Sequence, residues 1–231
     1  MSKPKTLIIS LGGSIIIPKP DVVNIPFLKK FQCLVLDFTK AGNRVAIITG
    51  GGKINKLYNQ SAKKIVKIKD IDLDWLGISF TKANAELVRS IFGSHAHPKV
   101  IVDPTEKIKT DKKIIIGCGW KPGCSSDKDA VLIAKNLKAK TIVNLTNIDY
   151  VYTADPKKDK TAKPLKDTTW KEYKNFIGGK WIPRMNTPFD PVASRLAQEL
   201  GLSVAIMKGT NLPNLKKFLS GKKFKGTLIH P

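Results

Sequence analysis

A chain of 231 residues is long enough for one large α/β domain to bury a core without crosslinks. Its three cysteines, Cys33, Cys118 and Cys124, fit neither a disulfide framework nor a zinc site, so we expect a reduced, cytoplasmic environment. No apolar run approaches the roughly 20 residues of a membrane span, and the N-terminal residues lack a signal-peptide pattern. We therefore predict no membrane partner.

The charge balance is strongly basic, with 41 Lys and Arg against 18 Asp and Glu and a formal net charge of +23. Such a balance suits polyanion binding, but the lysines are spread over many segments with few aromatic residues to stack on bases. We interpret most of the charge as solvated surface that attracts small phosphorylated molecules and expect no nucleic-acid partner. A non-catalytic basic protein that binds nucleotides or nucleic acid is the alternative from another class, and its affinity for nucleic acid should fall steeply with salt.

Strand-like and helix-like segments alternate from the start of the chain. The apolar run at 5–11 ends in glycines at 12–13, and four apolar residues then recur at helical spacing: Phe27, Phe31, Leu34 and Phe38. Residues 44–49 form a second buried-strand pattern, which again ends in glycines, at 50–52. These two strand-to-glycine passages predict a βαβ start.

The same alternation continues to the end of the chain. The expected elements are a helix at about 74–92, strands near 99–102 and 113–117, a helix at about 127–137, a strand at 141–145, a Pro- and Lys-rich loop at 155–166, a helix at 190–200, a strand at 203–207 and a short helix at 211–219. Continuous apolar strands separated by helices predict a mainly parallel sheet covered on both faces, which is a three-layer αβα sandwich. With no linker, residues 1–231 are expected to form a single domain.

Glycines follow the predicted strands where open α/β sheets bind their ligands. Backbone N–H groups at such turns hold anions, and glycine lets a phosphate approach closely. The familiar nucleotide motifs nevertheless fail. A Walker A loop would need glycine at Ile47 and Ser or Thr at Ile54, and a dinucleotide fingerprint would need glycine at Asn55. The sequence therefore predicts phosphate binding by a protein that is neither a P-loop kinase nor a Rossmann dehydrogenase.

Six stretches carry a resemblance that covers the whole chain: 10–14 (SLGGS), 48–53 (ITGGGK), 76–85 (LGISFTKANA), 144–156 (NLTNIDYVYTADP), 190–193 (DPVA) and 226–229 (GTLI). In order and spacing they resemble archaeal-type UMP kinases of the amino-acid-kinase superfamily. The resemblance implies the amino-acid-kinase fold and ATP-dependent phosphorylation of UMP to UDP in pyrimidine nucleotide biosynthesis. It also implies an N-terminal acceptor lobe at about 1–140 and a C-terminal ATP lobe at about 141–231.

The resemblance also implies which residues bind each substrate. The ATP-binding positions are Ser10, Leu11, Gly12, Gly13, Ser14, Gly52, Lys56, Thr146, Asn147, Tyr152 and Asp155. The UMP-binding positions are Gly50, Gly51, Asp74, Trp120, Lys121, Pro122, Gly123, Cys124, Ser125 and Ser126. Mg²⁺ would be held largely by ATP and water, with no metal cage of protein carboxylates. The resemblance also implies a homo-oligomer, a hexamer built as a trimer of dimers.

Three residues are expected to act in catalysis: Asp190, Lys208 and Lys53. Asp190 resembles the superfamily aspartate that orients a catalytic lysine. Many members carry that lysine just ahead of the first glycine pair, where this chain has Ser10. The positive charge must then come from Lys5, Lys53 or Lys208, and we rank Lys208 first because it follows a predicted strand.

The predicted UMP-binding loop at 120–126, called the acceptor loop below, departs from the family pattern. Cys124 replaces a histidine, Trp120 replaces a smaller polar residue, and two inserted residues leave either Asp127 or Asp129 in the place of the family aspartate. A kinase for another small acceptor, such as isopentenyl phosphate or carbamate, is therefore the nearest alternative. Asp74, predicted to open a long helix, has the competing interpretation of a simple helix N-cap.

Tyr150 stands where the superfamily usually has glycine. Two interpretations of this residue are equally open. Its ring can stack on a base or simply fill a turn.

Overall fold

The computed structural model describes residues 4–154, 156, 159–177 and 187–231. Its centre is a seven-stranded sheet in the order β3-β2-β1-β4-β8-β9-β7, and β5 and β6 form a separate two-stranded sheet. The strands are β1 Thr6–Leu11, β2 Arg44–Thr49, β3 Ile114–Gly117, β4 Thr141–Thr146, β5 Val151–Tyr152, β6 Pro164–Leu165, β7 Asp167–Thr169, β8 Ser203–Lys208 and β9 Thr227–His230.

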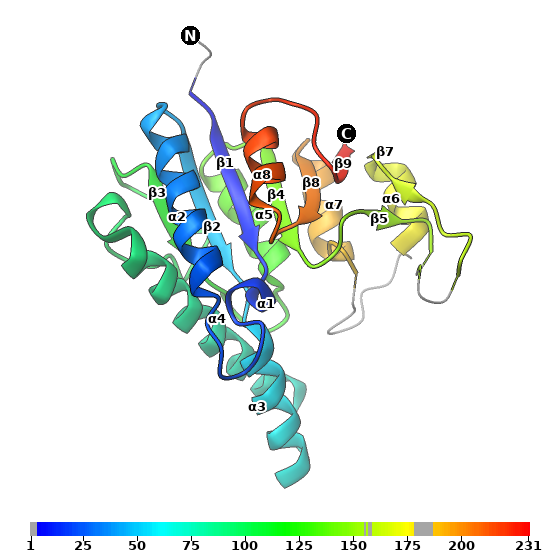
Figure 1. Cartoon of the computed structure of the whole chain (residues 1–231). Helices are drawn as coiled ribbons and strands as arrows, with labels where there is room; N and C mark the ends of the chain where they lie inside the picture. The colour runs from blue at the N-terminus through cyan, green and yellow to red at the C-terminus, as the bar shows by residue number, and fades with distance from the viewer. Residues whose placement is uncertain (1–3, 155, 157–158, 178–186) are drawn as a thin grey trace.

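Helices connect most of these strands (Figure 1). They are α1 Gly13–Ile16, α2 Ile25–Lys40, α3 Gly52–Ile65, α4 Asp70–Phe92, the 3-10 helix η1 Gly93–His95, α5 Ser126–Asn136, α6 Trp170–Ile177, α7 Pro191–Glu199 and α8 Leu212–Leu219.

The central strands are parallel, as predicted. β1 lies between β2 and β4 in parallel register, and β3 and β8 extend the sheet in the same direction. At the far side of this sheet, β9 runs antiparallel to its neighbour β8. A connection from one parallel strand to the next needs a crossover, which the intervening helices supply.

The two faces of the sheet carry separate cores. Leu7, Ile9 and Leu11 of β1 pack in one hydrophobic cluster with residues of α2, α4 and α8. Ile8 points to the opposite face, into a cluster with residues of α5, α6 and α7. This alternation follows from the period of two residues in a strand. Helices therefore cover both faces (Figure 1), and the predicted three-layer αβα sandwich is confirmed.

Two predicted elements differ from the structure. The long helix begins at Asp70 rather than near Asp74, so residues 70–73, which were not expected in the helix, form its first turn. The predicted strand at 99–102 forms only an isolated bridge between Ile101 and Gly117. Pro98 and Pro104 bound that short run, and proline restricts the residue before it and donates no hydrogen bond to a sheet.

The helices of the described ranges offer no segment that is both long and apolar enough to cross a membrane.

Candidate active site

The carboxyl ends of five parallel strands meet at one edge of the sheet. The loops that leave β1, β2, β3, β4 and β8 there begin at Gly12, Gly50, Cys118, Asn147 and Gly209. Most of the predicted site residues lie on these loops, although the loops are far apart in the sequence. The parallel topology alone brings them together.

The turns after β1 and β2 pack backbone against backbone. A Cβ atom on Gly13 would lie 2.1 Å from the backbone N of Gly52 and 2.4 Å from the carbonyl O of Gly50. A Cβ on Gly50 would lie 2.7 Å from the backbone N of Gly13. Gly52 has a φ of +79°, which favours glycine in any case. Glycine is therefore required here by the contact between the two turns, before any ligand is considered.

Two asparagines support the second glycine turn. Asn84 of α4 donates from Nδ2 to the carbonyl O of Gly50 at 2.7 Å. Asn55 of α3 lies against Gly51 and Gly77, and its buried Oδ1 has no hydrogen-bond partner. Sequence reasoning named neither asparagine as a site residue. Asn84 stood inside a stretch that carried the resemblance, whereas Asn55 had only its place one helical turn after Gly51 as a signal.

Asp74 lies in the second turn of α4, so it is not an N-cap: the helix begins at Asp70 and its capping position is Lys69. The Oδ2 atom of Asp74 accepts a hydrogen bond from the backbone N of Gly123 at 3.1 Å. The structure thus joins two predicted UMP-binding positions that are 49 residues apart in the chain.

The start of the acceptor loop is anchored by two further hydrogen bonds. The backbone N of Gly119 donates to Oγ1 of Thr81 at 2.9 Å, and that of Trp120 donates to Oδ2 of Asp129 at 3.2 Å. The ammonium of Lys121 lies over the Trp120 ring, 3.8 Å from its centroid. The loop is therefore held at its main chain, which leaves the side chains of Trp120 and Lys121 at its surface.

The end of the acceptor loop is tied to the C-terminal part of the chain. Ser125 caps α5 by accepting from the backbone N of Lys128 at 3.1 Å, and its hydroxyl donates to Oδ2 of Asp190. The Oδ1 atom of Asp190 accepts from the backbone N atoms of Val192 and Ala193, at 2.8 and 2.9 Å, as the N-cap of α7. Asp190 thus joins α7 to the acceptor loop.

Asp127, rather than Asp129, faces the first glycine loop. Its Oδ1 accepts from the hydroxyl of Ser10 at 3.4 Å, and its Oδ2 accepts from the backbone N of Asp190 at 3.2 Å. Asp129 lies deeper, 1% exposed, beneath Trp120, and its Oδ1 has no partner. Ser10, in the place of the usual lysine, is therefore in contact with an aspartate that the sequence left undecided.

Burial, and to a smaller extent the neighbouring Asp190 carboxylate, raise the pKa of Asp127 to about 7. Burial also raises the pKa of Asp129 to about 7, with a smaller contribution from Asp190. These two carboxyl groups therefore change their protonation state near neutral pH, whereas an ordinary aspartate is fully ionised there.

A buried tyrosine, Tyr173, fixes the backbone of Phe189, the residue just before Asp190. The hydroxyl of Tyr173 donates to the carbonyl O of Phe189 and accepts from its backbone N, both at 3.0 Å. Burial raises the pKa of Tyr173, which keeps the phenol protonated. Sequence reasoning missed Tyr173, because a tyrosine in an amphipathic helix carries no signal that distinguishes this role.

The three candidate lysines lie in different places. Lys208 ends β8 opposite Thr146 of β4, and Lys53 begins α3 beside the second glycine turn; both side chains are exposed. Lys5 precedes β1, so the six residues of that strand, at about 3.3 Å each, separate it from Gly12 by about 20 Å. No hydrogen bond or ion pair joins Lys208 to Asp190, two residues that the structure describes.

Some of the predicted ATP-binding residues can offer only their backbone to a ligand, and others can offer a side chain. The side chain of Leu11 is fully buried in the core, so only its backbone faces the edge. Lys56 is exposed on α3, and the hydroxyl of Thr146 donates to Oδ1 of Asn147 at 3.3 Å. Asp155 lies outside the described residues.

Thr227 of β9 holds the hairpin of β5 and β6, which carries Tyr152. The hydroxyl O of Thr227 accepts from the backbone N of Val151 at 2.9 Å, and the hydroxyl donates to the carbonyl O of Leu165. The rings of Tyr150 and Tyr152 meet edge to face, with centroids 6.5 Å apart.

Tyr150 itself lies beside a basic side chain. The ammonium of Lys225 is 5.9 Å from the Tyr150 ring centroid and forms an ion pair of 3.1 Å with Asp149. Tyr150 thus has contacts within the protein, as a turn-filling residue would.

In the ranges that the structure describes, the His, Cys, Asp and Glu side chains form no group of three or more that could hold a metal ion. The carboxylates nearest the glycine loops are the pair Asp127 and Asp190.

The fold and this site define an α/β protein that holds ligands beyond the carboxyl ends of its strands, in turns suited to phosphate. The chain belongs to the amino acid kinase family, whose profile matches residues 5–208.

Individual relatives agree with that assignment. The uridylate kinase of Methanospirillum hungatei is 33% identical over 229 residues, covering 97% of this chain and 94% of that protein. The uridylate kinase of Pyrococcus abyssi is 32% identical over 231 residues, covering 97% and 99%. The crystal structure of uridylate kinase from Archaeoglobus fulgidus superimposes with a TM-score of 0.80 at 27% identity, covering 96% of this chain and 99% of that one.

The contact between the glycine turns predicts a folding defect in Gly13→Ala. Its Cβ would meet backbone atoms that cannot move aside, so we expect a loss of about 3 kcal/mol, the upper end of the usual cost of overpacking. Denaturant unfolding measures it. The control is Gly77→Ala, inside α4, where the nearest atom would be 3.4 Å away and the variant should be equally or more stable. Equal stability of both variants would contradict the account.

The buried carboxyl of Asp129 predicts a specific dependence of stability on pH. Because its pKa in the folded state, about 7, is above the unfolded value, the wild type loses stability as the pH rises towards 7. The amide introduced by Asp129→Asn would keep an oxygen for the backbone N–H of Trp120 and stay neutral. We expect the melting temperature of this variant to exceed that of the wild type at pH 8, by a margin that shrinks at pH 5. Asp111→Asn, a change at an exposed position, should shift the melting temperature equally at both pH values. The raised pKa of Asp129 would be refuted if the difference in melting temperature between Asp129→Asn and the wild type were the same at pH 5 and pH 8.

Proposed function

We propose that this protein transfers the γ-phosphoryl group of ATP to UMP, giving ADP and UDP, in pyrimidine nucleotide biosynthesis in the cytoplasm. The observation that carries the proposal is the direct contact between two glycine turns beside an anchored acceptor loop. Phosphoryl transfer needs two phosphates brought in line, with backbone donors and cations around the transferring group. Two anion-binding turns in contact supply such an arrangement, and the relatives described above are named uridylate kinases.

In this proposal the acceptor lobe is residues 1–140 and the ATP lobe residues 141–231. The glycines at 50–51, Asp74 and the loop at 120–126 bind UMP, and the Asp74 carboxylate, which accepts from the backbone N of Gly123, contacts a ribose hydroxyl. The loop at 10–14, Gly52 and the residues after β4 bind ATP. Ser125 joins the two lobes through its hydrogen bond to Asp190.

The developing charge on the transferring group needs a cation, because Ser10 is neutral. Lys208 and Lys53 lie at the carboxyl edge of the sheet and can supply it, whereas Lys5 lies at the other end of β1. We propose Lys208 as the principal cation. Asp190 then acts by fixing α7 and the acceptor loop, since its carboxylate oxygens are bonded to those elements.

The donor set fits a magnesium ion that ATP brings, which usually keeps water ligands and takes one or two protein carboxylates. Asp127, facing Ser10 of the first glycine loop, is the carboxylate placed to approach it. When bound, the ion would neutralise charge on the phosphate oxygens. The residues of the chain orient the two nucleotides around it.

A kinase of isopentenyl phosphate or carbamate is the rival within the same fold. The position of Asp74 against the acceptor loop favours a nucleotide, because a carboxylate there suits a ribose hydroxyl, which neither rival acceptor has. The names of the relatives point the same way.

We also propose that the protein forms a homo-oligomer, a hexamer built as a trimer of dimers. Helix α3 buries none of its residues. Together with the first turns of α4 it exposes a group of large apolar side chains: Leu57, Tyr58, Ile65, Val66, Ile71 and Trp75. Figure 1 shows α3 extending beyond the body of the domain. Several exposed large apolar side chains on neighbouring helices are typical of an interface.

Acceptor choice is tested by a coupled ADP-release assay with UMP, CMP, AMP, isopentenyl phosphate and carbamate. We expect strong turnover with UMP and little with the others. In the matched variant Asp74→Asn, KM for UMP should rise far more than KM for ATP, since a ribose hydroxyl loses a charged acceptor. Turnover with isopentenyl phosphate or carbamate in preference to UMP would overturn the proposal.

The role of Lys208 predicts a kinetic signature. Removing one well-placed cation from such a site lowers turnover by about 100- to 1000-fold, so Lys208→Ala should reduce kcat by that factor with modest changes in KM. Steady-state kinetics measure both constants. Lys5→Ala is the matched control and should keep full kcat. Full activity of Lys208→Ala beside an inactive Lys53→Ala would move the role to Lys53.

Oligomer formation is tested by the molar mass in solution. The wild type should sediment as a particle several times heavier than its 25.5 kDa chain. A charge at an exposed apolar position should reduce that mass, so we expect smaller particles for Ile65→Glu, whose side chain is 84% exposed in the single chain. Val102→Glu, on a different surface, is the control. A monomeric wild type would refute the proposal.

A further inference from the structure

A second cavity lies at the amino edge of the sheet, opposite the proposed active site. Its volume is about 490 Å³, within the range of small-molecule sites. The lining comes from the start of β1, the ends of α2 and α8, and the turn between α5 and β4. None of the residues assigned above to ATP or UMP takes part in it.

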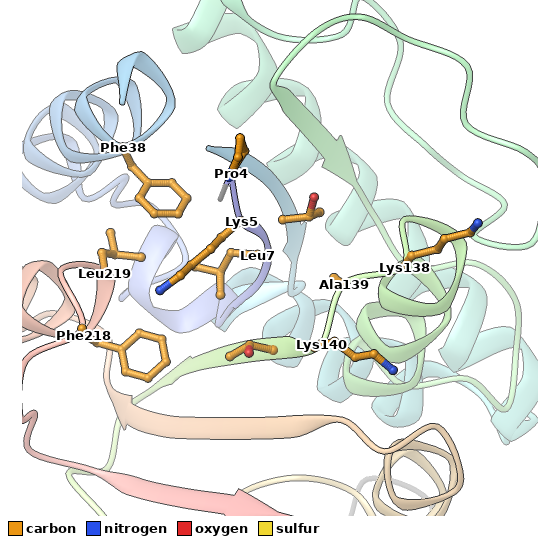
Figure 2. Close-up of a pocket in the computed structure, with 12 residues that line it drawn as sticks. Pro4, Lys5, Leu7, Phe38, Lys138, Ala139, Lys140, Phe218 and Leu219 are labelled. Carbon is orange, nitrogen blue, oxygen red and sulfur yellow. The ribbon is translucent and has the colours of Figure 1, made fainter. Parts of the chain in front are cut away.

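One wall of the cavity is aromatic and apolar. Phe38 at the end of α2 and Phe218 with Leu219 at the end of α8 lie together on this side (Figure 2). Phe218 is fixed by an edge-to-face contact with Phe224, with centroids 4.9 Å apart. Partly buried rings held in this way offer a rigid surface for an apolar or aromatic ligand.

The charged groups of the lining are all basic: Lys5, Lys138 and Lys140. Figure 2 shows the Lys5 side chain reaching towards Phe218 and Leu219, while Lys138 and Lys140 stand on the opposite side with their ammonium groups directed outward. The last two are exposed, and long lysine side chains can reorient towards an anion. The cavity thus combines an apolar wall with three lysines, and no acidic side chain is among the described residues that line it.

Lys138 has an unusual backbone conformation. It follows α5 with a φ of +53° and is the one non-glycine residue with positive φ among those the structure describes. Its N–H donates to Lys135 O, and that of Ala139 to Ala134 O, which is the bonding pattern of helix ends that normally carry glycine.

The other helices with this kind of ending do carry glycine. At the equivalent places after α2, α7 and α8 stand Gly42, Gly201 and Gly221. A residue with a Cβ is disfavoured in the left-handed region, so the backbone conformation does not favour a lysine there. Lys138 also lies on the rim of the cavity.

We propose that this cavity binds a small organic anion with an aromatic or apolar body, whose ring or chain packs on Phe38 and Phe218 and whose anionic group is held by Lys5, Lys138 and Lys140. A simpler view assigns Lys138 to neutralising the C-terminal dipole of α5. The two views differ for Lys138→Gly. Loss of a dipole partner lowers stability, whereas glycine at a positive φ relieves strain.

The probe is 8-anilinonaphthalene-1-sulfonate, an aromatic anion, titrated by fluorescence onto the full chain with saturating UMP and a non-hydrolysable ATP analogue present to occupy the active site. We expect saturable binding. Lys138→Gly and Lys140→Gln should each weaken it by about 10-fold, the loss of one charge-assisted contact, and should weaken the neutral analogue N-phenyl-1-naphthylamine much less. The melting temperature of Lys138→Gly should be unchanged or higher by up to about 4 °C.

Controls and competitors complete the test. Lys63→Gln, an exposed lysine on α3, changes net charge equally and should leave dye binding unchanged. Phe218→Leu should weaken both dyes. Displacement by AMP, which is not otherwise in the mixture, would identify a nucleotide as the ligand class, and displacement by decanoate an aliphatic carboxylate. The proposal is overturned if the lysine variants bind the dye like the wild type, if Lys138→Gly is less stable, or if neither competitor displaces the dye.

Discussion

The contact between the turns after β1 and β2 constrains everything else at the carboxyl edge of the sheet. Any side chain at Gly13 would run into the backbone of Gly50 and Gly52. Because the turns touch, the helices that follow them, α1 and α3, begin side by side. The proposed site for two phosphates therefore depends on the absence of three side chains rather than on any single charged group.

The rest of the site is arranged around that contact by hydrogen bonds between distant parts of the chain. Asp74 and Asp129 hold the acceptor loop to α4 and α5, and Asp190 joins the end of the loop to α7. The aspartates accept backbone or hydroxyl hydrogens, so they act first as positioning groups. Ser10 bonded to Asp127 replaces the cation that the superfamily often places there. In the proposed mechanism the positive charge comes from a separate strand end, that of β8, where Lys208 lies.

Much of this was predictable from the sequence. Continuous apolar strands followed by glycines indicated the parallel sheet and located the site at one edge, and the resemblance at 144–156 and 190–193 indicated the family. Some details were not predictable because they depend on contacts between distant residues. The start of α4 at Asp70, the bond between Asp74 and Gly123, and the choice of Asp127 over Asp129 are of this kind. Tyr173 carried no local signal, and Asn55 had only its place one helical turn after Gly51. Strand β9 was not predicted, because it forms only by pairing with β8 and β7, which are distant or irregular in the sequence.

The most direct test of the account is a crystal structure with UMP and a non-hydrolysable ATP analogue bound together. We predict the UMP phosphate against Gly51 and the acceptor loop, the triphosphate against the turn at Gly12 and Gly13, and the γ-phosphorus in line with the UMP phosphate oxygen. Lys208 should approach the γ-phosphate. A structure in which the two nucleotides occupy separate places, with the glycine turns contacting neither phosphate, would contradict it.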